Sequence, residues 1–60
     1  MTFKTPSDAV QALDTNVDRY YQDTVDHPTF RTTNRQIWRA IEAEPPAFKD
    51  AVLTLLRNTN

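Results

Sequence analysis

Residues 5–25 of the chain read TPSDAVQALDTNVDRYYQDTV, and this stretch decides the fold. Thr5 is a favourable N-cap, Pro6 suits the first position of a helix, and Asp8 suits the positive end of the helix dipole. The core-facing positions that follow recur with a helical period and form one stripe, which consists of Val10, Leu13, Val17, Tyr20, Tyr21 and Thr24. The pattern predicts an amphipathic helix over residues 6–25.

The first helix is expected to end before Pro28. A proline disfavours helical geometry at the residue that precedes it, which here is His27. Residues 27–33 are therefore predicted to form a connection, with Phe30 tucked beneath it as its one large apolar side chain. His27 is expected to close the first helix, where the positive form of its ring would suit the dipole.

A second and a third helix follow from capping residues and prolines. Thr33 and Gln36 have the spacing of a capping box, which predicts a helix over residues 34–44. Two consecutive prolines end this helix, and the second of them can begin a third helix over residues 46–57. No stretch alternates strictly between apolar and polar side chains, so no strand is predicted.

Together these segments predict an all-α fold, a compact three-helix bundle that forms a single domain over residues 1–60. The chain has no glycine, and three proline-delimited helices need no left-handed glycine. A core this small gives marginal stability, so docking to another chain is expected, either a second copy in a homodimer or a different protein. The centre of the core is expected to contain Leu13, Val17, Ile37, Trp38, Ile41, Val52 and Leu55.

The composition excludes several of the common kinds of catalytic site. Without glycine there is no phosphate-cradling loop, and without cysteine there is no thiolate, disulfide or zinc finger. The single serine, Ser7, and the single histidine, His27, are joined by no motif, so we expect no enzyme activity, no catalytic residue and no cofactor. Asp23, Asp26 and His27 offer three ligands for a metal. Structural metal sites usually need four, and Pro28 interrupts the helix there, so no metal is expected.

Charge and hydropathy narrow the class of protein further. The formal net charge is −1, whereas proteins that bind nucleic acids usually carry a clear positive excess. No apolar run approaches the roughly 18 residues that span a membrane, and residues 1–4 lack the apolar core of a signal peptide. We expect a complete, soluble protein of the cytoplasm.

The charges are divided unevenly along the chain. Residues 8–26 carry five aspartates and one arginine, a net charge of −4, while the remaining residues sum to +3. One explanation is attraction between the acidic first helix and the basic second helix, at less than about 1 kcal/mol for each exposed pair. The other is that Arg31, Arg35 and Arg39 form a patch that docks on an acidic protein surface or a phosphate.

Three aromatic side chains are candidates for a binding surface. Tyr20 and Tyr21 are consecutive, so their side chains diverge by about 100° around a helix and one of them must lie at the rim of the core. The rim tyrosine is either boundary packing or an interface anchor. Trp38 is expected in the core, and it becomes a binding anchor if the three helices do not cover it.

These features predict a small non-catalytic helical protein that acts by binding another protein, as a regulatory subunit or inhibitor of the kind that mobile elements encode. The partner-binding residues are expected to be Arg31, Arg35, Arg39, Tyr20 and Tyr21.

The alternative is a helix-turn-helix-like regulator that binds DNA with the second and third helices. Its three arginines would contact phosphates, and its third helix would read bases through Lys49, Thr54, Arg57 and Asn58. Against this alternative, the turn is Pro-Pro and lacks the common glycine, and the third helix is mostly apolar.

Overall fold

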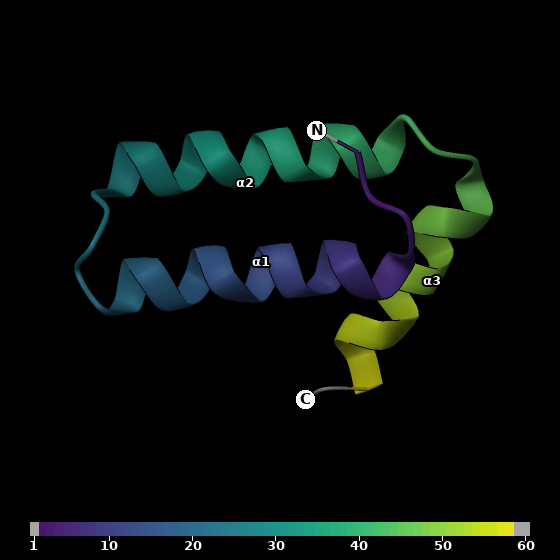
Figure 1. Ribbon diagram of the computed structural model, residues 1–60, viewed down its shortest axis with the longest axis horizontal. Helices are drawn as coiled ribbons and strands as arrows, with labels where there is room; N and C mark the ends of the chain where they lie inside the picture. The colour runs from purple at the N-terminus through teal and green to yellow at the C-terminus, as the bar shows by residue number, and fades with distance from the viewer. Residues whose placement is uncertain (1, 59–60) are drawn as a thin grey trace.

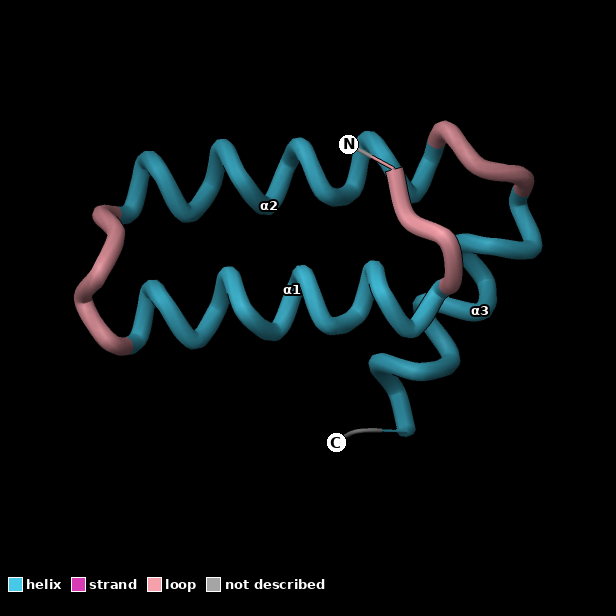
Figure 2. Tube along the Cα trace, viewed as in Figure 1, coloured by secondary structure: helices cyan, strands magenta, loops and turns pink. Residues whose placement is uncertain are grey.

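The computed structural model describes residues 2–58, which form three helices and no strand: α1 (Pro6–Tyr21), α2 (His27–Glu42) and α3 (Pro46–Asn58). α1 and α2 lie side by side and antiparallel as a hairpin, and α3 packs across one end of it (Figure 1). Figure 2 shows the two short loops between the helices and the N-terminal segment, which lies at the same end as α3. The predicted three-helix bundle is confirmed. None of the helices within residues 2–58 is long and apolar enough to cross a membrane.

α1 begins where the sequence predicts. Thr5 has extended backbone angles, and its hydroxyl accepts a hydrogen bond from the backbone N–H of Asp8 at 3.2 Å. Pro6 occupies the first helical position, where its missing N–H leaves no hydrogen bond unmade. The side of α1 that faces the core then buries Ala9, Val10, Leu13 and Asn16.

The predicted end of α1 at residue 25 is wrong, because the helix ends at Tyr21. The chain closes it with a Schellman motif, in which the N–H of Thr24 donates to the carbonyl of Arg19 at 3.0 Å and the N–H of Asp23 donates to the carbonyl of Tyr20 at 3.1 Å. Asp23 has a φ of 57°, in the left-handed region that glycine usually occupies. A left-handed residue is therefore needed after all, and an aspartate supplies it.

The predicted connection over residues 27–33 is also wrong, because α2 already begins at His27. Asp26 caps it: its carboxylate accepts a hydrogen bond from the N–H of Thr29 at 3.0 Å. Pro28 lies in the first turn, where a proline is tolerated, so it begins this helix and does not only end the previous one. Thr33, predicted as the N-cap, lies in the middle of the helix, and His27 opens α2 where it was expected to close the first helix.

The end of α2 and the bounds of α3 lie close to the prediction. α2 ends at Glu42, two residues before the predicted end, and α3 extends one residue beyond it, to Asn58. Lys49 and Glu42 form an ion pair of 3.6 Å between the two helices, and both side chains are largely exposed. Such a pair adds well under about 1 kcal/mol to stability.

The core lies where α3 crosses the hairpin. Of the predicted centre, Leu13, Ile37, Ile41 and Val52 are buried, but Val17, Trp38 and Leu55 are only half-buried. α3 reaches only one end of the hairpin (Figure 1), so the three helices cannot enclose all of these side chains. Small residues and one valine that the prediction left out complete the buried apolar set: Ala9, Val10 and Ala40.

The bundle is compact, and its accessible surface and radius of gyration are slightly above the averages for its size. The accessible surface is 4494 Å², whereas size scaling gives about 4,000 Å² for a monomer of 7.0 kDa. The Cα radius of gyration is 11.6 Å, compared with about 10 Å for a typical domain of this length. The chain therefore leaves more surface exposed than an average globular monomer does.

Candidate functional site

The three arginines of the predicted patch lie on one helix. Because α2 begins at His27, Arg31 lies within the helix and not before its cap. Arg31, Arg35 and Arg39 then follow one another at intervals of about one turn, and all three side chains are exposed. Arg39 lies eight positions after Arg31, which corresponds to a rise of about 12 Å along the helix. We name this row the arginine stripe.

No acidic side chain pairs with the arginine stripe anywhere in residues 2–58. The ion pair found there is the one between Lys49 and Glu42, which links α3 to α2. Asp14 and Asp18 are exposed on α1, one turn apart, and neither forms an ion pair. Of the two explanations for the uneven charge, attraction between α1 and α2 thus has no direct contact in its favour.

An aromatic cluster occupies the end of the hairpin that α3 does not reach. Tyr20 lies at its centre, with its ring centroid 4.7 Å from that of Phe30 and 5.7 Å from that of His27. The hydroxyl of Tyr20 is 3.3 Å from Nδ1 of His27. Phe30 therefore packs from within α2 against α1, and not beneath a loop as predicted.

The two tyrosines diverge as predicted. Tyr20 is half-buried in the aromatic cluster, while Tyr21 is 78% exposed and meets Tyr20 edge-on at 6.0 Å. Phe30 immediately precedes Arg31 on α2, so the aromatic cluster and Arg31 lie at the same end of the hairpin, although the side chains of these two residues diverge by about 100° around the helix. Arg39 lies two turns further along α2, and the structure does not bring it near the tyrosines.

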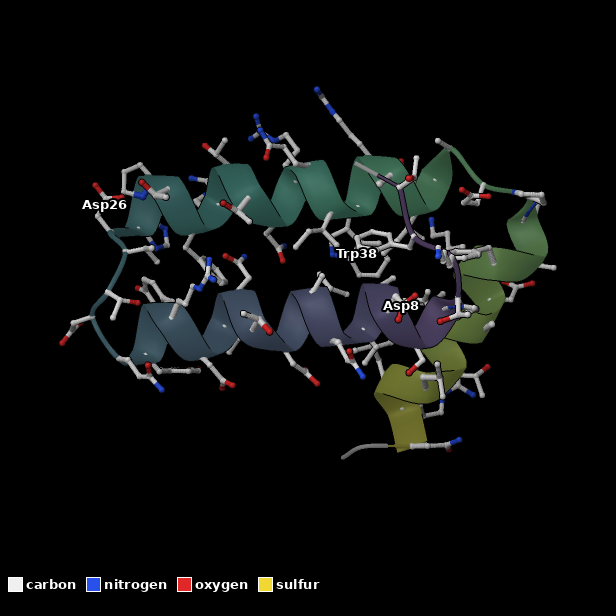
Figure 3. The ribbon with its side chains drawn as sticks, viewed as in Figure 1. Asp8, Asp26 and Trp38 are labelled. Carbon is white, nitrogen blue, oxygen red and sulfur yellow. The ribbon has the colours of Figure 1, made fainter. Side chains whose placement is uncertain are left out.

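The residues of the hypothetical metal site serve the helix ends (Figure 3 labels Asp26 at this end of the hairpin). Hydrogen bonding from Thr29, first from its side chain and then from its backbone N–H, holds the pKa of Asp26 below its usual value. Asp23 occupies the left-handed position after α1, and the ring of His27 meets Tyr20. Among the residues that the structure describes, no three His, Cys, Asp or Glu side chains gather where they could hold a metal ion.

Trp38 lies between α1 and α2, as Figure 3 shows. It is half-buried and packs against the buried cluster, together with Phe3 from the N-terminal segment and Phe48 from α3. The side chain is thus a partly covered member of the core, which is intermediate between the two roles that the sequence suggests.

Sequence reasoning missed one polar residue and two hollows. Asn16 is buried on α1 because it lies on the same side of the helix as Leu13 and Tyr20. This helical phase could have identified it from the sequence. A shallow hollow of about 530 Å³ beside Arg39 and a groove of about 350 Å³ between α1 and α2 have no signal in the sequence. Both depend on how side chains from separate turns or helices come together.

Comparison with known proteins adds no guide to function. No family profile, no curated protein and no solved structure matches this chain. Function must therefore be inferred from the side chains and their geometry.

Proposed function

We propose that this chain is a non-catalytic module that docks on an acidic surface of another protein. The arginine stripe makes the contact, with Tyr20 and Tyr21 at its Arg31 end. One observation carries the proposal: the continuous helix from His27 aligns three exposed guanidinium groups, and none of them has an acidic partner within residues 2–58. A module of this kind acts as a regulatory subunit or an inhibitor of a larger protein.

The chemistry of arginine suits this role. Each guanidinium presents five N–H donors in a planar fork that matches a carboxylate, and arginine and tyrosine are enriched at the centres of protein interfaces. Because the guanidinium groups of the arginine stripe form no ion pair within residues 2–58, a partner's carboxylates can bind them without breaking one. The spacing of one helical turn also matches carboxylates that repeat every turn along a partner helix.

The small core gives a second reason for a partner. Within residues 2–58, the largest fully buried side chains are Ile37, Ile41 and Val52, and much of the remaining surface is accessible to solvent. A complex that covers part of this surface adds stability through mass action, since only the folded state binds.

The positions of the reactive side chains favour binding over catalysis. Ser7 lies in the first turn of α1, whereas His27 packs beside Tyr20 near the other end of that helix. Tyr20 lies thirteen positions after Ser7, a rise of about 20 Å along α1, so the hydroxyl of Ser7 and the imidazole of His27 lie far beyond the roughly 3 Å that a nucleophile and its base need.

The DNA-binding alternative has one observation in its favour. Residues 43–45 make a three-residue connection between α2 and α3, which is the length typical of a helix-turn-helix. However, the exposed side of α3 includes Asp50 and the apolar Leu53, which is 41% exposed, beside Thr54 and Arg57. A carboxylate and a leucine suit a protein surface better than the phosphates that flank a DNA groove.

Affinity capture from the native cell with a matched pair of variants tests the proposal. R35E/R39E reverses two charges of the arginine stripe, and K4E/R57E makes the same change in net charge at exposed positions outside it. We expect the wild type and K4E/R57E to retain a protein partner that R35E/R39E loses. With the purified partner, R35E/R39E should raise Kd at least about tenfold while the far-UV circular dichroism stays unchanged.

Two results would contradict the proposal. If R35E/R39E captures and binds the same partner as K4E/R57E does, the arginine stripe is not the contact surface. If instead the chain retards duplex DNA at low salt, and moderate salt steeply weakens the retardation, the helix-turn-helix alternative is supported.

A further inference from the structure

A groove of about 350 Å³ runs between α1 and α2, and no residue of the arginine stripe lines it. Its floor includes Ile37 and Asn16, which are both buried. The α1 wall has residues at intervals of four, three and four positions, a spacing that keeps side chains on one side of a helix. These wall residues are Asp8, Ala12, Thr15 and Arg19.

The wall has small side chains at its centre and opposite charges at its ends. Asp8 and Arg19 are exposed, and neither forms an ion pair with any residue in the range 2–58. They cannot pair with each other, because they lie eleven positions apart on the helix, a rise of about 16 Å. Ala12 and Thr15 lie midway between them, so the centre of the wall has short side chains that do not project far from the helix.

We propose that this groove binds a second copy of the chain, with the two α1 helices antiparallel. A two-fold axis at the centre of the wall brings Asp8 of each copy opposite Arg19 of the other. Ala12 of each copy then lies opposite Thr15 of the other, beside the axis. The wall is complementary to itself. Asp8 and Arg19 lie at equal distances from its centre, so in an antiparallel copy each charge faces the opposite charge.

The remaining side chains of the groove fit this arrangement. Ala12 and Thr15 are small enough for two helix axes to approach within the usual 8–10 Å. Gln11 lines the same groove from α1 and Thr33 from α2, and both are uncharged, so no like charges are added. Asp14 and Asp18 do not line the groove, so the self-complementary wall excludes most of the acidic charge of α1.

The groove and the arginine stripe share no residue, so the two surfaces can act separately. A dimer through the groove leaves the arginine stripe available to a different protein. It also covers part of the accessible surface of this small bundle, and it allows one assembly to present two arginine stripes.

Complementary charge reversal in the whole 60-residue chain tests the proposal. D8R has bases at both ends of the wall, and R19D has acids at both ends, so each variant alone should repel its own copy. We expect sedimentation equilibrium to show a dimer for the wild type and at least about a tenfold higher dimer dissociation constant for each single variant. An equimolar mixture of D8R and R19D, and the double variant D8R/R19D, should each recover the dimer.

D14R is the matched control, since it reverses an exposed aspartate of α1 outside the groove, and it should dimerise like the wild type. Circular dichroism and thermal unfolding establish that each variant is folded, and R19D keeps the test valid if D8R weakens the first turn of α1. A wild type that stays monomeric up to about 1 mM overturns the proposal. So does a dimer that D8R and R19D leave unchanged, or whose loss neither the mixture nor the double variant repairs.

Discussion

The side-chain amide of Asn16 on α1 donates a hydrogen bond to the backbone carbonyl of Phe30 on α2, at 3.2 Å. Asn16 is only 5% exposed, and it is the buried polar residue of the described chain. Within residues 2–58, every buried side-chain nitrogen or oxygen has a hydrogen-bond partner. Because this bond joins the two helices outside the region that α3 covers, it helps to set how α2 lies along α1.

Replacing Asn16 should therefore destabilise the hairpin in a way that depends on the chemistry of the substitute. N16D is expected to lower the free energy of unfolding by about 2–3 kcal/mol, because a carboxylate cannot donate to the carbonyl of Phe30 and its charge would be buried. N16L removes the donor without adding a charge, so a loss nearer about 1 kcal/mol is expected. Urea unfolding at pH 7 measures both losses. Because both variants lose the donor, equal losses would exclude a contribution from the buried charge, and an N16L variant as stable as the wild type would show that the hydrogen bond does not stabilise the hairpin.

The ring of Tyr20 should matter more than its hydroxyl. Y20A removes the packing against Phe30 and His27 and is expected to cost about 1–3 kcal/mol. Y20F keeps the ring and loses only the exposed 3.3 Å contact with Nδ1 of His27, so a change within about 0.5 kcal/mol is expected. Thermal or chemical unfolding of the two variants distinguishes the contribution of the ring from that of the hydroxyl. A Y20F loss as large as that of Y20A would contradict the assignment.

Asp26 should make the stability of α2 sensitive to acid. Hydrogen bonding from Thr29 lowers the pKa of Asp26 in the folded state, while in the unfolded chain the pKa returns to about 3.9. The unfolded state then binds more protons between these two values, so stability is present above about pH 4 and is lost as the pH falls through the folded-state pKa.

D26N isolates this contribution, because asparagine caps a helix about as well as aspartate but does not titrate. The melting temperature of the wild type should exceed that of D26N, or equal it, at pH 7 and should fall more steeply below about pH 4. Melting curves from pH 7 to about pH 2.5 check this. Parallel pH profiles for the two proteins would rule out a special role for Asp26, since all other carboxyl groups are common to both.

Asp23 offers a stabilising substitution. A non-glycine residue in the left-handed region carries a steric cost that glycine avoids, and glycine is the usual residue at this position of a Schellman motif. D23G is expected to raise the free energy of unfolding by about 0.5–1 kcal/mol, and D23A to lower it. Chemical unfolding compares the three proteins. A D23G variant no more stable than D23A would mean that the residue does not hold a positive φ in solution.

The ends of the helices show how far local signals reach. The starts of α1 and α3 are predicted correctly, because Thr5 with Pro6, and Pro46 after its neighbouring proline, act within one turn of chain. The start of α2 is not, because Pro28 can end one helix or begin another. Which role Pro28 takes depends on whether α1 has already ended. The left-handed backbone conformation of Asp23 ends α1 before Pro28 is reached.

The candidate surface was likewise only partly predictable. The identity and exposure of Arg35 and Arg39 follow from the charge pattern and the apolar phase of the second helix. That Arg31 joins them in one row follows only once Asp26 is known to cap α2. The groove that Asp8 and Arg19 share with Ile37 has no local signal at all.

Periodicity, capping and proline placement are enough to specify three amphipathic helices, their all-α class and the charges they carry, since each depends on neighbours a few residues away. The packing of α3 against one end of the hairpin settles the rest. Because α3 covers only that end, Trp38 and Val17 remain half-buried. The opposite end of the hairpin is packed by the aromatic cluster around Tyr20. These outcomes depend on how side chains remote in sequence fit together, and no local pattern encodes that fit.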